Sequence, residues 1–213
     1  MNKNKSKNKI IAELKKEISH LKKLVVQDEL TSALNRTGFK KEVADILKEV
    51  VFFKKTKRKK KNIHRKKFLA RELSVLFIDV DGLKKINDLH GHSTGDRLIK
   101  KTAILIKENV RTTDFVGRWG GDEFVVAFPG SSEGDAYKIS EKIRKSIKNK
   151  GKMLGLRKAK VSLSIGVVGV TKELLASSDS LTIDDLIDYA DVAMYEAKRV
   201  RGGDNSVKYS EIS

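Results

Sequence analysis

The sequence predicts an α/β domain in which helices cover a mixed central sheet, preceded by an N-terminal helix. Three observations support this fold class. Helical patterns alternate with short apolar segments along most of the chain. Residues 73–80 form an apolar run rich in branched side chains, which is typical of a buried strand. A Gly-Gly turn between the apolar segments 115–116 and 124–128 predicts one central hairpin.

The composition restricts the classes of protein to which the chain can belong. Its 213 residues suffice for one domain with a sizeable core and appendages. No cysteine is present, which excludes disulfides and thiolate chemistry and fits a reducing compartment. Residues 1–9 lack the apolar region of a signal peptide, and no apolar run is long enough to cross a membrane. These features predict a cytoplasmic protein.

The net charge of +18 suggests a nucleic-acid binder until its distribution is considered. Residues 54–67 hold ten Lys and Arg and no acid, and residues 1–9 hold four Lys and no acid. The rest of the chain has 32 basic and 28 acidic residues, so the predicted folded body is nearly balanced. The 54–67 segment fits a solvated loop better than a site for nucleic acid or anionic membrane, and both interpretations stay open.

The N-terminal part contains two predicted helices. Within residues 10–27, apolar side chains recur at intervals of three and four and form an apolar seam: Ile11, Leu14, Ile18, Leu21 and Val25. This seam fits a short dimerising coiled coil and equally a helix packed on its own domain. The second helix covers residues 35–50, with one apolar face: Phe39, Val43, Ile46 and Val50.

Periodicity and turn residues predict the remaining elements. In order, they are the strand at 73–80, a short helix or turn at 82–88, a loop at 91–95, a helix opening at Asp96, the hairpin, a helix at 133–149, a strand at 161–170 and a final helix at 183–199. Apolar spacing predicts the inward side chains of these three long helices: Ile99, Ala103, Ile106 and Val110; Ile139, Ile143 and Ile147; Leu186, Ala190, Ala193 and Ala197.

The hairpin turn, Arg118-Trp119-Gly120-Gly121-Asp122-Glu123-Phe124, is the segment that most suggests chemistry. Its glycines would let the backbone adopt positive φ angles and approach a ligand closely. The two acids that follow them suit a hard cation such as Mg²⁺ on nucleotide phosphates. Considered alone, the turn fits an ordinary hairpin with a polar tip better, since short motifs recur by chance.

A second acidic pair favours a metal site. Asp79 and Asp81 stand where the predicted buried strand ends, and Asp79 would meet Asp122 if this strand lies beside the hairpin. Together with the Val80 carbonyl, these two carboxylates could hold Mg²⁺ on a triphosphate. Asp79 also fits a helix N-cap, although Asp81 fits that role better because it directly precedes residues 82–84.

Three polar residues farther along fit either nucleotide recognition or ordinary surface roles. Lys84 could meet phosphate beside free backbone N–H groups, or could be an exposed lysine on a short helix. Asn87 offers a donor and an acceptor, and the Asp96 carboxylate accepts from paired N–H donors, which together complement the edge of guanine. Either could as easily be a cap or loop residue.

Several further motifs occur in a fixed order along the chain. They are Asp28-Glu29-Leu30-Thr31 with Asn35-Arg36, the segment from Phe77 to Asp88, Gly91-His92-Ser93-Thr94-Gly95-Asp96, Ser164-Ile165-Gly166, and Ala190-Asp191 with Tyr195-Glu196-Ala197-Lys198. With the hairpin turn, they make residues 28–205 resemble the GGDEF family of diguanylate cyclases. The resemblance implies a fold like the palm of nucleotide cyclases and polymerases, and condensation of two GTP into cyclic di-GMP and two pyrophosphates.

The resemblance also implies a role for each matching residue. Catalytic roles would fall to Asp122, Glu123 and Lys84, metal ligation to Asp79, Asp122 and the Val80 carbonyl, and GTP contacts to Asn87, Asp96, His92 and Lys198. The implied cofactor is Mg²⁺ or Mn²⁺, with two ions per active site. Arg111 and Asp114 match the Arg-x-x-Asp site at which members of the family bind their product and are inhibited, whereas without the resemblance they fit a surface ion pair.

Two features depart from the family pattern. An arginine is expected four residues after Lys198, where Gly202 stands, and Arg199 or Arg201 could take its place. The basic stretch 54–67 looks like an insertion into a connection that is usually short.

The preferred interpretation is therefore an active cyclase that works as a homodimer, with one GTP held by each subunit. The alternative is a non-catalytic GGDEF-like domain that senses GTP or cyclic di-GMP, which the intact set of acids disfavours. The predicted organisation is a polar N-terminus with a candidate coiled-coil helix at 1–27 and a GGDEF domain at 28–208. An upstream sensor domain or a separate partner would supply the input signal.

Overall fold

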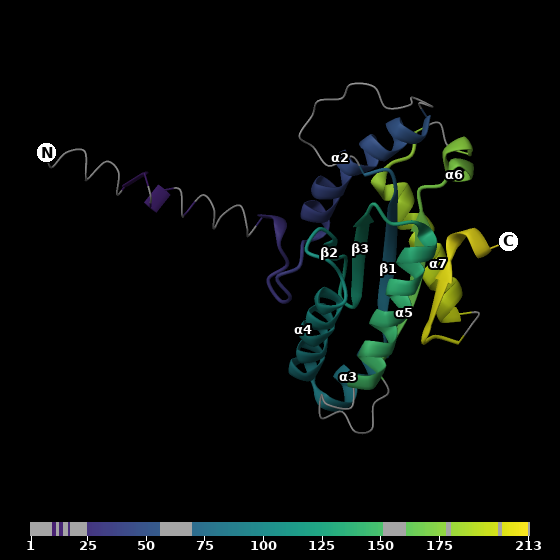
Figure 1. Ribbon diagram of the computed structural model, residues 1–213. Coiled ribbons are helices and arrows are strands. Elements are labelled where there is room, and N and C mark those ends of the chain that lie inside the picture. The colour runs from purple at the N-terminus through teal and green to yellow at the C-terminus, as the bar shows by residue number, and fades with distance from the viewer. Residues whose placement is uncertain are drawn as a thin grey trace, which may run out of the picture.

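The computed structural model describes residues 10–11, 13–14, 17, 25–55, 70–150, 161–177, 180–199 and 202–212. Its elements form one sheet with helices on both faces (Figure 1). In chain order they are α2 (Arg36–Lys55), β1 (Leu73–Asp81), α3 (Leu83–His90), α4 (His92–Glu108), β2 (Phe115–Arg118), β3 (Glu123–Pro129), α5 (Glu133–Lys150), β4 (Ser162–Gly169), α6 (Lys172–Ala176), α7 (Ile183–Arg199), β5 (Asn205–Lys208) and a 3₁₀ turn (Tyr209–Glu211).

The five strands lie in the order β2-β3-β1-β4-β5. Neighbouring strands are antiparallel except β4 and β5, which are parallel, so the predicted mixed sheet is confirmed. The hairpin was predicted as central, yet β2 is the outermost strand on its side. Strand β5 and helix α6 were not predicted, because four and five residues are too few to show a period.

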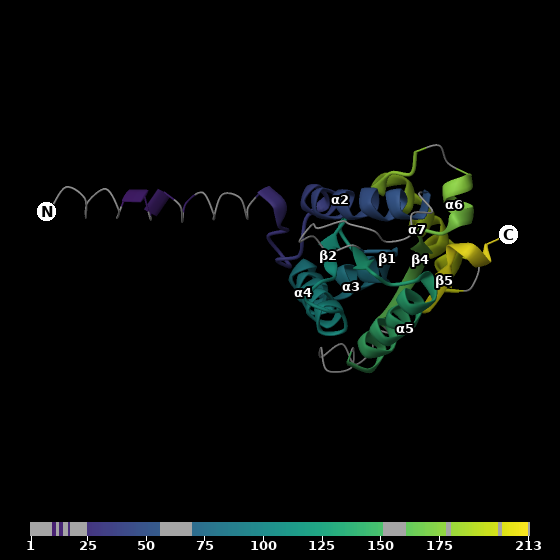
Figure 2. The ribbon, with the colours of Figure 1, turned by 45° about the horizontal axis from the view of Figure 1, so that its top comes forward.

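Alternation along β1 divides the apolar core in two. Leu76, Ile78 and Val80 pack with α3, α4 and α5, whereas Val75 and Phe77 pack with α2 and α7. Figure 2 shows α2 and α5 on opposite sides of the sheet. Every residue of β1 from Leu73 to Val80 is buried, as the apolar run predicts. The same alternation places Asp79 on the side of α7.

Helix α7 lies directly on the sheet at Gly166 of β4. A Cβ atom at Gly166 would stand 1.9 Å from the Ala190 carbonyl oxygen, so this backbone contact requires glycine. The inward face predicted for the helix is confirmed, since Leu186, Ala190, Ala193 and Ala197 are all buried. This close packing brings the C-terminal turn of α7 to the end of β1.

The connection between α3 and α4 corrects a prediction. Residues 91–95 were expected to form a loop and Asp96 to open the helix, but α4 begins at His92. Gly91, with φ of 79°, by itself joins the end of α3 to the start of α4. The amides of Thr94 and Gly95 already bond the Gly91 carbonyl, so the turn is helical despite its polar residues.

The predicted N-terminal seam is partly covered by the described residues. Ile11, Leu14 and Val25 are helical and 49%, 51% and 65% exposed, so they are not covered by the domain's own helices. Ile18 and Leu21 lie outside the described residues, as does most of the basic stretch at 54–67. Lys54 and Lys55 form the end of α2, which extends five residues beyond the predicted end at residue 50.

Candidate active site

The Gly-Gly turn is built by the β2–β3 hairpin. The amides of Trp119 and Gly120 donate to the Glu123 carbonyl at 2.8 and 3.5 Å, which closes the turn. Neither glycine has a positive φ, so the predicted reason for the glycines is wrong in part. A Cβ atom at Gly120 would lie 2.5 Å from the Glu123 carboxylate, the end of a flexible side chain, so a larger residue there would push that carboxylate aside.

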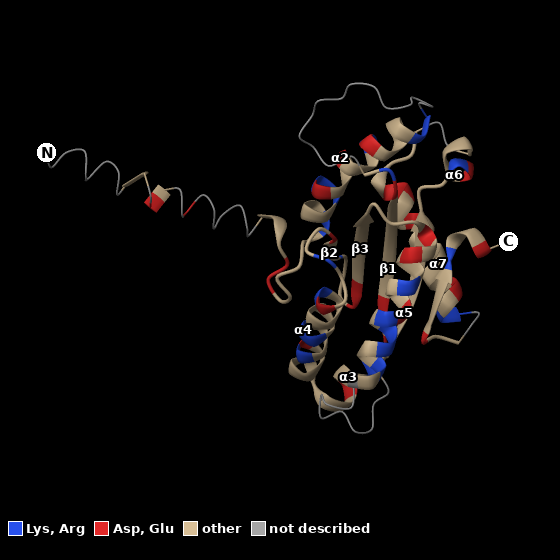
Figure 3. Ribbon diagram, in the orientation of Figure 1, with Lys and Arg blue, Asp and Glu red and all other residues tan. Residues whose placement is uncertain are grey.

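Strand pairing brings the predicted metal ligands together. Asp79 of β1 stands opposite Glu123 of β3, and the Val80 amide donates to the Asp122 carbonyl at 3.1 Å. Acidic residues accordingly mark the adjacent ends of β1 and β3 (Figure 3). β1 does lie beside the hairpin, as expected, and this register puts Asp122 next to Glu123, the residue opposite Asp79.

Asp79 is a buried carboxylate, only 6% exposed, and its partner comes from α7. The Lys198 ammonium donates to Asp79 Oδ1 at 2.8 Å. Burial raises the pKa of Asp79, the bond from Lys198 opposes this, and the charges of Asp122 and Asp81 raise it further. Burial alone would lower the pKa of Lys198, but its bond to Asp79 and the nearby acids raise it. The neighbouring negative charges disfavour the charged form of Asp79, an effect that a bound cation would relieve.

Asp191 of α7, which has no predicted site role, adds its charge to the same cluster. Burial raises the pKa of Glu123, and the charges of Asp122, Asp191 and Asp79 raise it further. Asp191 itself has a raised pKa because of burial and the nearby Asp188. The signal available in the sequence was the position of Asp191, seven residues or two helical turns before Lys198 on the same helix.

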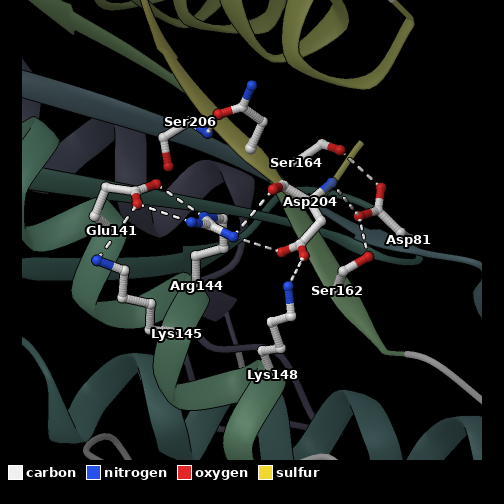
Figure 4. Close-up of polar contacts among 10 residues, drawn as sticks. Asp81, Glu141, Arg144, Lys145, Lys148, Ser162, Ser164, Asp204 and Ser206 are labelled. Carbon is white, nitrogen blue, oxygen red and sulfur yellow. Dashed lines mark hydrogen bonds and ion pairs between the residues drawn. The ribbon is translucent and has the colours of Figure 1, made fainter. Parts of the chain in front are cut away.

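The prediction that Asp81 caps the helix after the strand is wrong, because Asp81 does not cap α3. The N-cap position is Gly82, without a side-chain hydrogen bond. The Asp81 carboxylate instead accepts from the Ser162 and Ser164 hydroxyls at 2.6 and 2.8 Å and from the Asp204 amide at 3.3 Å (Figure 4). These contacts tie the end of β1 to β4 and to the loop after α7, so Asp81 is occupied structurally.

The loop after α7 explains the missing arginine. Gly202 and Gly203 have φ of 80° and 77°, and the Gly203 amide caps α7 by donating to the Ala197 carbonyl. An arginine at 202 would be strained in this left-handed conformation. Asp204 follows with φ of 49° and binds Arg144 and Lys148 of α5 at 2.7 and 2.6 Å (Figure 4).

Neither predicted substitute for that arginine is shown at the site. Arg201 lies outside the described residues. The Arg199 guanidinium stands 5.6 Å from the ring centroid of Tyr195, on the exposed side of α7.

The predicted guanine-reading residues lie on α3 and α4. Asn87 is half-buried, and its Oδ1 atom is buried with no hydrogen-bond partner among the described residues. A Cβ atom at Gly95 would stand 1.9 Å from this oxygen, so the glycine leaves the room that the amide occupies. Asp96, the residue after Gly95, is exposed, as are His92 and Lys84. The structure thus places Asn87 and Asp96 on neighbouring helices, with the buried, unsatisfied Asn87 Oδ1 against Gly95 of α4.

Arg111 and Asp114 form the turn between α4 and β2. The Arg111 amide donates to Asp114 Oδ2 at 2.7 Å, while Asp114 Oδ1 is buried without a partner among the described residues. Burial raises the pKa of Asp114, which the Arg111 amide and charge oppose. Both residues line a cavity of about 350 Å³ with Lys107, Gln27 and other residues of the 27–34 segment.

The family model described as "Diguanylate cyclase, GGDEF domain" matches residues 25–204. The chain belongs to the GGDEF domain family. Diguanylate cyclase DosC of Escherichia coli is 35% identical over 195 residues, which are 89% of this chain and 36% of DosC. The chain thus spans about a third of the length of the curated relatives it matches.

Solved structures agree with the GGDEF fold. The coiled coil and GGDEF domain of DgcB from Caulobacter crescentus, solved with c-di-GMP, gives a TM-score of 0.77 at 22% identity, covering 95% of each chain. The GGDEF domain of YfiN (TpbB) from Pseudomonas aeruginosa gives 0.66 at 31% identity, covering 86% of this chain and 94% of that one. In the described part of the chain, no helix is both long and apolar enough to cross a membrane.

The donor set is compatible with a divalent ion on a nucleotide. Within the described residues, no three or more Asp, Glu, His or Cys side chains surround one metal position. Asp79 lies near the end of β1 and Asp122 directly precedes β3, and the Val80 amide joins the two segments by donating to the Asp122 carbonyl. Two carboxylates suit Mg²⁺, which usually takes few protein ligands and completes its shell with phosphate and water, and the Val80 carbonyl is the third ligand that the sequence predicts.

Proposed function

We propose that this GGDEF domain is a diguanylate cyclase that condenses two GTP into cyclic di-GMP and two pyrophosphates at the interface of a homodimer. The observation that carries the proposal is the position of Asp79 and Asp122 at the adjacent ends of β1 and β3, beside Glu123. The family membership and the named relatives support it. The proposal places the domain in the cytoplasm, where GTP is present.

The residues of the chain divide the work in this proposal. Asp79, Asp122 and the Val80 carbonyl would hold Mg²⁺ or Mn²⁺, two ions per site, which would neutralise charge on the triphosphate when bound. Asp122 would help to remove the proton of the 3′-hydroxyl, with Glu123 beside it. Lys84 and Lys198 would contact phosphate oxygens. Lys198, on α7, already donates to the Asp79 carboxylate of β1.

Guanine would be read by Asn87 and Asp96, with His92 nearby on α4. The buried Oδ1 of Asn87 is unpaired, which supports a ligand donor in that position. The Asp96 carboxylate would accept from N1–H and N2–H₂ of guanine, donors that adenine lacks. The proposal therefore predicts GTP as substrate and excludes mixed products with ATP.

Dimerisation is required because one subunit holds only one of the two reacting nucleotides. The exposed seam residues Ile11, Leu14 and Val25 support an N-terminal coiled coil that would hold two domains together. A sensor or partner acting through this helix remains part of the proposal. Binding of nucleic acid or anionic membrane through residues 54–67 stays a prediction, since nearly all of that stretch lies outside the described residues.

Product inhibition is a second proposed activity, carried by the unpaired buried Oδ1 of Asp114. An Arg fork can grip phosphate or guanine, and a carboxylate beside it can accept guanine N–H groups. Cyclic di-GMP would bind at the cavity lined by Arg111 and Asp114, whose lining residues do not include the acids of the turn.

One assay tests the proposed cyclase. Purified protein is incubated with GTP and Mg²⁺, the products are separated by chromatography, and a parallel reaction contains equal GTP and ATP. The cyclase function is supported if cyclic di-GMP forms, if EDTA abolishes its formation, and if the Asp122→Asn variant does not form it. Saturable GTP or cyclic di-GMP binding without product would replace it with the sensing function, and substantial mixed dinucleotide would refute the role of Asp96.

A further inference from the structure

Arg118, the last residue of β2, holds the backbone of the turn that carries Asp122. Its Nε donates to the Gly120 carbonyl at 3.1 Å, and its Nη2 donates to the Gly121 carbonyl at 2.7 Å. Glycine backbone is conformationally free, so the two glycines are the part of the turn with the most conformational freedom. The contacts from one rigid guanidinium to both of their carbonyls restrict that freedom. The turn therefore depends on where Arg118 is held.

Asp28 is the group that anchors Arg118. The third branch of the guanidinium, Nη1, contacts both oxygens of Asp28 at 3.1 and 3.3 Å, and the two side chains are only 18% and 21% exposed. Asp28 Oδ1 also accepts from the Thr31 amide and hydroxyl at 2.8 and 2.7 Å. Burial would raise the pKa of Asp28, but the bonds from Thr31 and Arg118 lower it, so the carboxylate is charged at neutral pH.

A second set of contacts joins the same two regions. The Asn35 side chain donates from Nδ2 to the carbonyls of Val25 and Gln27, and its Oδ1 accepts from the Gly38 backbone amide at 2.8 Å. The next residue, Arg36, lies 4.4 Å above the ring centroid of Trp119 and donates to the Trp119 carbonyl. Both sets of contacts start at residues 25–28, of which 25 and 26 are helical, and end at residues 119–121.

We propose that Arg118 and Asp28 are positioning residues for the reaction, setting the turn that carries Asp122 from the place where the N-terminal helix meets the domain. The effect on turnover rests on the proposed cyclase function, whereas the effect on the turn does not. A catalytic group displaced by about 1 Å can cost about a hundredfold in rate. The same contacts give a movement of the N-terminal helix a direct route to the turn.

The chain offers a reporter for this turn, because Trp119 is its single tryptophan. The experiment compares wild type, Asp28→Asn and Arg118→Lys by tryptophan emission and acrylamide quenching without nucleotide, and by kcat and KM for GTP. Asp185→Asn is the matched control. Asp185 accepts from the Thr182 amide and hydroxyl at 2.8 and 2.7 Å, as Asp28 does from Thr31, but it has no arginine partner among the described residues.

The expected result is a red-shifted, more readily quenched Trp119 in both test variants and a fall in kcat of about ten- to a hundredfold with unchanged KM. The control should match wild type in both readouts. Lysine should not rescue, since it keeps the charge but cannot reach three acceptors at once.

Unchanged Trp119 fluorescence in folded Asp28→Asn would overturn the proposal, as would full kcat in Arg118→Lys. If wild type makes no cyclic di-GMP, the cyclase function fails, and the fluorescence comparison still decides whether these residues set the turn. Should Arg118→Lys fail to fold, the isosteric Asp28→Asn carries the same two readouts.

Discussion

A single methyl group at Gly95 should separate nucleotide recognition from stability. Gly95 is buried in the first turns of α4, and a Cβ atom there would stand 1.9 Å from Asn87 Oδ1 and 2.9 Å from Asn87 Cγ. Both atoms belong to the end of a side chain, so in Gly95→Ala the Asn87 amide must turn away while the backbone stays in place. The variant therefore removes the proposed guanine contact without touching a charged residue.

The two consequences of the change have different magnitudes. Alanine in place of glycine inside a helix stabilises it by about 1 kcal/mol, and an off-rotamer Asn87 costs roughly the same amount. The melting temperature should consequently stay within a few degrees of wild type, about the shift that 1 kcal/mol produces. Losing an amide that both donates to and accepts from guanine should cost about 1–3 kcal/mol of binding, or about 5- to 150-fold in kcat/KM.

The assay is steady-state turnover of GTP alongside thermal unfolding, with Gly134→Ala as the control. Gly134 lies in the first turn of α5, where the nearest heavy atom to an added Cβ is 4.0 Å away, so the same substitution meets no clash. Gly95→Ala should raise KM strongly, whereas Gly134→Ala should leave it unchanged. A Gly95→Ala enzyme with wild-type KM would show that Asn87 does not read guanine.

Three further predictions follow from the site and its supports. Asp79→Ala or Asp122→Ala should abolish cyclisation while circular dichroism stays native, because a ligand is lost and not the core; turnover retained at the same Mg²⁺ concentration would place the metal elsewhere. Arg111→Ala should keep its initial rate but lose the slowing that accumulating cyclic di-GMP causes in wild type, and identical progress curves would exclude an inhibitory site there. Burial alone would raise the pKa of Asp204, but bonds from Lys148 and Arg144 lower it. The charged carboxylate therefore stabilises the fold at pH values above its unfolded pKa of about 4, and this stabilisation is lost as the pH falls through the lower folded pKa. Asp204→Asn should therefore be less stable than wild type at pH 7, by about 2 kcal/mol, and the two should converge in acid; parallel unfolding free energies from pH 7 to about pH 2 would contradict this.

Local pattern determined most of the secondary structure and the place of the acids. The apolar run at 73–80 and the spacing of Leu186, Ala190, Ala193 and Ala197 gave β1 and the buried face of α7, because burial on one side repeats with the period of the element. The turn sequence and Asp79 pointed to one site for a different reason: strand ends and hairpin tips lie at the edges of a sheet.

Other properties depended on residues far apart in the chain. The sequence suggested a cap for Asp81 and positive φ for the glycines of the turn, and the structure showed otherwise. Asp81 is held by Ser164, 83 residues away, and Arg118 by Asp28, 90 residues away. Periodicity reports which face of an element is buried, but a charge takes the partner that the packed fold places beside it. That is why the acids could be located from the sequence, whereas the groups that hold them in place could be identified only in three dimensions.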